Sequence, residues 1–334
     1  MRVWQIPSFG IDALEFTERP DAEPGPGQVR VRVRAVSLNY RDLLMVTGRY
    51  NPKLKLPRIP CSDGAGEVEA VGPGVTAWKP GDRVAGIFMQ NWVDGEPTRE
   101  KVAGALGGDM DGMLAERVVL SERGLVAAPE HLSLEEAATL PCAAVTAWNA
   151  LAAGNPRPGA TVLIQGTGGV SIFALQFAKL IGARVLGISS SDEKLERARS
   201  LGLDEGLNYR ATPEWDRWVS DRTNGEGVDL VVEVGGVGTL ARSLRAVRIG
   251  GAIAQIGVLA QNAEPLPVPL ILHKQVRMRG IYVGSRRDFE QMNGAIAHAQ
   301  LRPVFASTPW TLAREALRRM EAGSHFGKLV LTVD

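Results

Sequence analysis

The sequence predicts an α/β protein of two domains, one a doubly wound parallel sheet and the other a small, mostly antiparallel barrel. The chain has 334 residues, enough for two domains that each bury a core. Between about residues 130 and 285, strand-like and helix-like segments alternate, which is typical of a parallel sheet covered by helices. Before about residue 125, short β-like runs recur every ~10 to 20 residues between Gly and Pro turns, which favours a barrel.

The barrel strands are predicted at GQVRVRVRAVSL, GEVEAVGPGV, GDRVAGIF and AERVVL. After Ser285 the pattern predicts a helix at DFEQMNGAIAHAQ, a short strand, a second helix and a terminal strand at GKLVLTV. We expect this tail to return to the first domain. The predicted domains are therefore residues 1–128 with 286–334, and residues 129–285.

The most informative segment, residues 161–191, reads TVLIQGTGGVSIFALQFAKLIGARVLGISSS. Apolar runs at 162–164 and 185–188 predict parallel strands on either side of a Gly-rich turn and a helix. A dinucleotide-binding fingerprint requires this setting, whereas the alternative is an ordinary strand–helix turn.

The glycines of this turn suit a nucleotide site. Gly166 permits the tight turn, and Gly168 lets the backbone approach a pyrophosphate at the helix N-terminus, where N–H groups are free. Ser171, a small residue, takes the place of the third glycine. The predicted cofactor-binding loop consists of Gly166, Thr167, Gly168, Gly169 and Val170.

The end of the second strand indicates which dinucleotide binds. NAD sites usually carry Asp or Glu there, which accepts from the ribose 2′-hydroxyl. The polar residues at this position and after the next apolar segment are Ser189, Ser190, Lys194, Tyr209 and Arg210. Hydroxyl groups and cations can donate to a 2′-phosphate, so we expect NADP(H). The alternative is that Asp192 and Lys194 merely begin a helix.

Later strands are predicted at 230–234, 252–256 and 278–283, and they end in EVGGVG, QIGVLA and YVGS. Ligands of open α/β sheets bind beyond the carboxyl ends of the strands. The candidate cofactor-binding residues at these ends are Gly235, Gly257, Val258 and Val283.

Composition argues against several classes of partner. The 38 basic and 37 acidic residues nearly cancel, so nothing favours nucleic acid or an anionic membrane. No apolar run approaches the roughly 20 residues of a membrane span. The N-terminal residues lack a signal-peptide core, and two cysteines cannot form a disulfide scaffold. We therefore expect a cytoplasmic protein, in which the scattered histidines (131, 273, 298 and 325) are surface or structural residues.

Motifs from end to end of the chain carry a family resemblance: SLNYRDLLMVTGRY, PCSDGAGEVEAVGPGV, GDRVAG, LPCAAVTAWNAL, GTGGVS and HFGKLVL. On these, the chain resembles the medium-chain dehydrogenase/reductase superfamily, and most closely its quinone-oxidoreductase-like, enoyl-reductase-like and zinc-type alcohol dehydrogenase-like members. The resemblance implies a GroES-like barrel domain packed on a Rossmann domain, with the active site in the cleft between them. It also implies a homodimer or homotetramer.

The chain departs from the zinc alcohol dehydrogenases at the metal ligands. Those enzymes hold a catalytic metal with Cys, with His followed by Glu, and with a second Cys. The matching positions here are Asn39, Ser62, Asp63 and Cys142. Neither an amide nor a hydroxyl is a good zinc ligand, and the region of the structural-zinc lobe, residues 92–113, contains no cysteine. We therefore expect no metal; the alternative is that Cys61, Asp63 and Cys142 converge on one.

Losing the metal changes the favoured chemistry. Hydride addition to a quinone, or to a C=C conjugated with a carbonyl, delocalises charge, so modest hydrogen-bond donors suffice. We therefore expect NADP(H)-dependent reduction of quinones or α,β-unsaturated carbonyls. One alternative is an NAD(P)-dependent alcohol dehydrogenase acting on alcohols or aldehydes. Another is a non-catalytic NADPH-binding sensor or structural protein.

Catalytic candidates come from the barrel domain. Tyr50 ends VTGRY, which looks like the Gly-x-Tyr segment where enoyl reductases place a catalytic tyrosine; a turn tyrosine is the alternative. Asn39 and Tyr40 are the second pair, with Tyr40 alternatively a core aromatic on a strand. By resemblance, Thr146 lies beside the nicotinamide and Lys328 lines the cleft.

The substrate is expected to be a small molecule, apolar or aromatic. Met89 and Trp92, together with Tyr282, predict such a pocket, and ordinary packing is the alternative. Residues 90–111 are predicted to form a flexible lid or a subunit contact. No cluster of Lys and Arg indicates a coenzyme A or acyl-carrier site.

Overall fold

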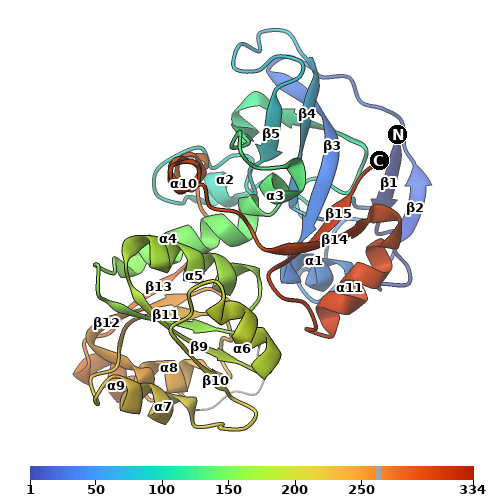
Figure 1. Cartoon of the computed structure of the whole chain (residues 1–334). Coiled ribbons are helices and arrows are strands. Elements are labelled where there is room, and N and C mark those ends of the chain that lie inside the picture. The colour runs from blue at the N-terminus through green and yellow to red at the C-terminus, as the bar shows by residue number, and fades with distance from the viewer. Residues whose placement is uncertain (260–264) are drawn as a thin grey trace. The chain divides into compact units, whose positions relative to one another are not determined.

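The computed structural model describes residues 1–259 and 265–334 (Figure 1). The chain divides into two compact units, Met1–Val145 with Val283–Asp334 (unit 1) and Thr146–Tyr282 (unit 2). The tail returns to the first unit as predicted, because its last strand pairs with a strand near the start of the chain. The first boundary lies later than expected, since residues 129–145 belong to unit 1.

Unit 1 is built on a mostly antiparallel seven-stranded sheet in the order β14-β15-β3-β4-β5-β7, with β6 also paired to β3. Its strands are β3 (Gln28–Leu38), β4 (Asp63–Val71), β5 (Arg83–Gly86), β6 (Arg117–Ser121), β7 (Leu125–Ala127), β14 (Phe305–Pro309) and β15 (Lys328–Thr332). A separate antiparallel pair consists of β1 (Arg2–Gln5) and β2 (Glu15–Glu18). In β3 the alternation of Val and Arg buries one face of the strand against the core.

The helices of unit 1 are short, apart from one in the tail. They are α1 (Tyr40–Val46), α2 (Arg99–Val102), α3 (Leu134–Ala138), α10 (Arg286–Ala299) and α11 (Ala313–Glu321), with single turns η1 (Glu122–Gly124), η2 (Leu140–Ala144) and η3 (Trp310–Leu312). α3 packs on β3 and β4, and η2 packs on β4. These contacts explain why residues 129–145 belong to this unit.

Unit 2 contains a six-stranded sheet whose pairs are all parallel, in the order β10-β9-β8-β11-β12-β13 (Figure 1). The strands are β8 (Thr161–Gln165), β9 (Arg184–Ser189), β10 (Glu205–Asn208), β11 (Val228–Glu233), β12 (Val247–Gln255) and β13 (Arg277–Gly280). The helices are α4 (Val145–Gly154), α5 (Gly169–Ile181), α6 (Asp192–Arg199), α7 (Trp215–Arg222), α8 (Leu240–Ala246) and α9 (Val268–His273). The strand order reverses between β8 and β11, and dinucleotides bind at such a switch point.

The strands predicted in unit 2 are all present, with bounds shifted by a few residues. The largest difference is in β12, which begins at Val247 because its first residues pair with β11 before a register shift. Across residues 1–259 and 265–334, no helix is long and apolar enough to cross a membrane.

Candidate functional site

The Gly-rich loop of unit 2 joins β8 to α5, beside the switch point. Gly166 has a φ of +71°, the left-handed region that favours glycine, and its N–H donates to the carbonyl of Ile188. Gly168 is the extended N-cap of α5. A Cβ placed on either glycine would meet no atom within 4 Å, so the backbone borders open space.

Ser171, in the first turn of α5, links the helix to the end of the strand before the same loop. This residue is buried, and its hydroxyl donates to the carbonyl of Gln165 at 2.6 Å. Thr167 is buried, while Gly169 and Val170 are half-buried at the start of the 13-residue helix α5. Open glycine backbone at a helix N-terminus is the arrangement that receives a pyrophosphate. The loop therefore fits a dinucleotide.

The end of β9 carries the serines that the sequence analysis selected. Ser189 is the buried last residue of β9, and its carbonyl accepts from the N–H of Tyr209 at 3.0 Å. Ser191 is the N-cap of α6, and its hydroxyl accepts from the backbone N–H of Lys194. The alternative interpretation, that Asp192 and Lys194 begin a helix, is therefore confirmed, and a role of Lys194 in phosphate binding stays a prediction.

Positive charge gathers beyond this strand. Burial lowers the pKa of Lys194, the charge of the neighbouring Glu193 opposes this shift, and the charges of Arg197 and Arg210 add to it. Of the acidic residues at the start of α6, Asp192 accepts from the side chain of Asn208 at 3.1 Å. Lys194 is therefore close enough to Arg197 and to Arg210 to feel their charges, and cations so placed suit a phosphate dianion. Arg197 was not among the sequence candidates, since it lies inside a helix with no motif to mark it.

A buried carboxylate braces the loop after β11. Glu233 is fully buried; its Oε1 accepts from the N–H groups of Gly235 and Gly236 at 2.8 and 2.9 Å and from the hydroxyl of Thr239 at 2.5 Å. Its Oε2 accepts from the side chains of Gln165 and Ser243. Sequence reasoning missed this residue, because it looked like the polar end of an apolar strand.

The glycines after β11 and β12 serve packing between loops. A Cβ on Gly257 would lie 1.8 Å from the carbonyl oxygen of Val234, and one on Gly235 would lie 2.2 Å from the Thr239 hydroxyl. Neither glycine could carry a side chain unless these atoms shifted, and the role of both in cofactor binding stays a prediction. Val258 is 67% exposed.

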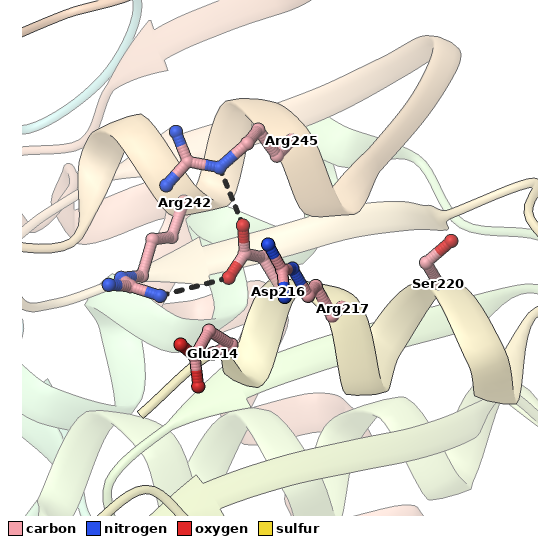
Figure 2. A pocket seen from close by; sticks show the side chains of 6 residues that line it. All are labelled: Glu214, Asp216, Arg217, Ser220, Arg242 and Arg245. Atoms are coloured by element: carbon pink, nitrogen blue, oxygen red, sulfur yellow. Dashed lines mark hydrogen bonds and ion pairs between the residues drawn. The ribbon is translucent and has the colours of Figure 1, made fainter. Parts of the chain in front are cut away.

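A surface cavity of about 440 Å³ lies between α7 and α8 in unit 2 (Figure 2). Glu214, Arg217 and Ser220 lie on one side. Across it, Asp216 pairs with Arg242 at 3.1 Å and with Arg245 at 2.5 Å. Because these charges neutralise one another, we interpret the ion pairs beside the cavity as a contact that holds the two helices together.

Unit 1 contains a buried polar cluster where β15, β3 and β4 lie side by side. Lys328, the first residue of β15, is 3% exposed, and its Nζ donates to the Leu38 carbonyl at 2.7 Å and to Asn39 Oδ1 at 2.6 Å. The same ammonium lies 3.7 Å from Oδ2 of Asp63, at the start of β4. Lys328 was expected to line the cofactor cleft, but the structure commits its ammonium to partners inside unit 1.

The cluster contains all four positions that match zinc ligands by resemblance. Asp63 is fully buried and accepts from the Ser62 hydroxyl at 2.7 Å and from the Cys142 N–H at 3.1 Å. Nδ2 of Asn39 lies 3.4 Å from Oγ of Ser62. Burial raises the pKa of Asp63, and Lys328 is the strongest opposing influence.

The cysteines offer little to a metal. Burial raises the pKa of both thiols, Cys61 and Cys142, and so disfavours the thiolate that would bind zinc. Within the described residues, no three His, Cys, Asp or Glu side chains are placed to hold a metal ion. Among the residues that the structure describes, Cys61, Asp63 and Cys142 therefore do not converge to form a metal site.

Helix α1 positions the remaining catalytic candidates. Asp42 Oδ2 accepts from the N–H of Asn39 at 2.7 Å and so caps the helix. Arg41 lies over the rings of Phe88 and Tyr50, 4.6 and 5.4 Å from their centroids, and donates to the Leu106 carbonyl. Tyr50 is 42% exposed in the turn after the helix.

One interpretation placed Tyr40 on a strand, and the structure shows that it is not on one. It is the first residue of α1 and packs against the core of unit 1. The cause is the capping contact from Asp42, which ends the strand at Leu38 and starts a helix.

The residues of the predicted substrate pocket are divided between the two units. Met89 and Trp92 are buried, and Trp92 Nε1 donates to the Gly95 carbonyl at 2.8 Å, so both serve packing. Their loop is held by Lys101, which donates to the carbonyls of Asp94 and Glu96. Tyr282 is 47% exposed, at the end of unit 2.

Two further cofactor candidates lie at the unit boundaries. Thr146 is buried in the first turn of α4, and Val283 is buried with a left-handed φ of +59°. Of the scattered histidines, His131 has a structural contact, with Nε2 3.1 Å from the Leu301 carbonyl.

Comparisons with known proteins agree with both units. A family model described as an alcohol dehydrogenase GroES-like domain matches residues 25–130, and one described as zinc-binding dehydrogenase matches residues 169–298. A zinc-type alcohol dehydrogenase-like protein of Schizosaccharomyces pombe is 44% identical, over 97% of this chain and 96% of its own. An acryloyl-coenzyme A reductase of Metallosphaera sedula is 33% identical, over 88% of each chain. The solved structure of an NAD-dependent alcohol dehydrogenase has a TM-score of 0.92 at 36% identity, over the full length of both chains.

The residues at the matching positions fit zinc poorly. They offer an amide, a hydroxyl, one carboxylate and a thiol whose pKa burial raises. The Lys328 ammonium already lies against two of them, and a second cation there would be repelled.

Proposed function

The chain belongs to the medium-chain dehydrogenase/reductase superfamily, and we propose that it is a metal-free, NADP(H)-dependent reductase of quinones or α,β-unsaturated carbonyl compounds. As an NAD(P)H-dependent oxidoreductase it uses a nicotinamide cofactor and a small-molecule substrate. The observation that carries the proposal is the position of the Lys328 ammonium. It is hydrogen-bonded to Asn39 and lies beside Asp63, two positions that match the metal ligands of zinc alcohol dehydrogenases.

The chemistry follows from what these groups can donate. When bound, the cofactor supplies the hydride. Adding it to a conjugated C=C or a quinone places charge on an enolate or phenolate oxygen, which hydrogen-bond donors stabilise. We assign this donation to the Asn39 amide. Tyr50, 42% exposed, is the proposed proton donor, because a phenol can protonate the enolate.

The preference for NADP(H) rests on the end of β9. Ser189 stands where an NAD enzyme would carry a carboxylate, and Lys194, Arg197 and Arg210 lie together beyond it. A 2′-phosphate would be attracted by these cations and would meet no acidic residue at Ser189. The structural relative named as NAD-dependent makes NAD the alternative.

The relatives support two substrate classes. The acryloyl-coenzyme A reductase acts, by its name, on a C=C conjugated with a carbonyl, in line with the proposal. The relatives named alcohol dehydrogenase favour oxidation of an alcohol as the second candidate. A non-catalytic role has no such support.

A side-by-side assay separates these candidates. NADPH and NADH oxidation would be followed with a quinone, an enone and a simple aldehyde, and the reverse reaction with alcohols. The proposal predicts turnover of quinone or enone with NADPH preferred. Turnover of aldehyde and alcohol alone would establish the second candidate instead.

We also propose a homodimer formed through β13. This strand is the edge of the sheet and pairs only with β12 among the described strands, and all four of its residues are exposed. Leu272 of α9, just before it, is 74% exposed. Exposed edges invite pairing, and a second copy related by a two-fold axis could continue the sheet. Leu272→Glu should shift the mass in solution toward the monomer, whereas Leu312→Glu in unit 1 should not.

A further inference from the structure

Tyr50 lies in a turn whose backbone is fixed by the end of α1. Gly48 has a φ of +72°, the left-handed region that favours glycine, and the chain reverses its direction there. The N–H groups of Arg49 and Tyr50 both donate to the carbonyl of Leu44, at 2.8 and 3.1 Å. This reversal brings the ring of Tyr50 back to Arg41, near the start of the same helix.

The guanidinium of Arg41 contacts the faces of two aromatic rings. Its central carbon lies 4.6 Å from the ring centroid of Phe88 and 5.4 Å from that of Tyr50. Phe88 is buried, whereas Tyr50 is largely exposed for an aromatic residue. A cation within about 6 Å of a ring face is attracted by the ring quadrupole. Arg41 therefore links an exposed ring to a buried one.

Arg41 is held in turn by the loop that contains Leu106 and Gly108. Its Nη1 donates to the carbonyl of Leu106 at 2.8 Å, and its Nη2 lies so close to Gly108 that a Cβ there would overlap it. Nε is buried and has no hydrogen-bond partner among the described residues, so the guanidinium depends on its ring contacts as well as on Leu106. The guanidinium is therefore a fixed surface against which the Tyr50 ring packs.

We propose that Arg41 is a positioning residue for Tyr50: its guanidinium packs on the ring and keeps the hydroxyl in the direction from which it donates a proton to the substrate. This rests on the proposed function, in which Tyr50 is the proton donor. An exposed side chain in a turn would otherwise sample several rotamers, and a proton donor works only within hydrogen-bond reach of its acceptor.

The first test is a double-mutant cycle on Arg41→Met and Tyr50→Phe, assayed with the quinone or enone that the wild type reduces. If Arg41 acts through the Tyr50 hydroxyl, Arg41→Met alone lowers kcat about tenfold with little change in KM. In the Tyr50→Phe background the same change has little further effect, because the hydroxyl to be positioned is absent. A full tenfold loss in both backgrounds would overturn the proposal.

Two further variants separate the shape of Arg41 from its charge. That charge also opposes the rise that burial causes in the pKa of Asp42. Arg41→Lys keeps the charge but loses the flat guanidinium, so it should be nearly as slow as Arg41→Met. Gly108→Ala keeps Arg41 and displaces its guanidinium, so it should also lower kcat. Wild-type rates in both would show that only the charge matters and would overturn the proposal.

A second measurement needs neither turnover nor an assigned substrate. The chain has four tyrosines, so in protein labelled with ¹³C in the tyrosine rings the Tyr50 signal is identified by its loss in Tyr50→Phe. Arg41→Met and Gly108→Ala should both shift this signal, while Arg32→Met, at an exposed arginine of β3, should not. An unchanged signal in both variants would contradict the proposed contact.

Melting temperature and NADPH binding show whether each variant is folded. A wild type that reduces neither quinone nor enone would sink the proposed function and the catalytic part of this proposal with it. The Tyr50 signal reports separately on whether Arg41 holds the ring, so the two failures are distinguishable.

Discussion

The side chain of Gln165 ties the Gly-rich loop to the loop after β11: its Nε2 donates to Glu233 at 2.8 Å, and its Oε1 accepts from the N–H of Gly235 at 3.2 Å. Two loops on either side of the switch point are therefore joined by one buried network. This network leaves neither end of the amide unpaired.

Removing the buried carboxylate should loosen both loops. Glu233→Ala takes the acceptor from several buried donors, so we expect the free energy of unfolding to fall by at least about 3 kcal/mol. The Kd for NADPH should rise tenfold or more. Urea unfolding and fluorescence titration measure the two effects. Glu226→Ala, which removes an exposed carboxylate from the same unit, should change neither; a near-normal Kd in Glu233→Ala would show that the network supports the fold alone.

Cofactor preference should depend on the end of β9. Lys194→Ala combined with Ser189→Asp should lower the ratio of kcat/KM for NADPH to that for NADH by tenfold or more, since one charge-assisted contact contributes about 1.5–3 kcal/mol. Arg199→Ala removes the same charge from the same helix, where Arg199 pairs with Glu196, and should leave the ratio unchanged. An unchanged ratio in the first variant would place the 2′-phosphate elsewhere.

Tyr50 and Tyr40 should behave differently when their hydroxyl groups are removed. Tyr50→Phe should lower kcat by about 100-fold, because the proposed proton donor is lost. Tyr40→Phe keeps the ring that packs on the core and should retain nearly the wild-type rate. Steady-state kinetics on both variants provide the comparison. If the two lose activity equally, or Tyr50→Phe loses none, Tyr50 is a turn residue.

Stability should fall as pH rises through the titration of Asp42. Burial raises the pKa of this carboxyl to about 6, above the 3.8 of an unfolded Asp, with Arg41 opposing the shift and Asp63 adding to it. The folded state therefore binds more protons between these values, and unfolding becomes easier by about 2 kcal/mol from pH 4 to 7. Asp42→Asn should remove this part of the decline, because the amide oxygen can still accept from Asn39. Chemical unfolding at several pH values, with Asp221→Asn as an exposed control, measures it; an unaltered slope in Asp42→Asn would contradict the assignment.

The sequence predicted the fold well because apolar runs and turn residues are local signals. The two units, the parallel sheet and the returning tail all follow from such runs, and the Gly166–Gly168 turn has its open backbone where the fingerprint requires it. The cluster around Lys328 could not be predicted by the same means. Lys328 lies 289 residues from Asn39, and only the pairing of β15 with β3 brings them together. Glu233 and Arg197 were missed for another reason, since no local motif marks a charged residue at the end of a strand or inside a helix.

The most direct test of the central claim is activity after removal of metal. The protein would be dialysed against a strong chelator, its metal content measured, and NADPH oxidation followed with the quinone or enone. An enzyme that needs no metal, because Lys328 lies against the positions that match zinc ligands, retains its full rate with less than stoichiometric zinc. Added zinc then gives no increase. Stoichiometric zinc in the untreated protein, with activity lost on chelation and restored by zinc, would contradict the account.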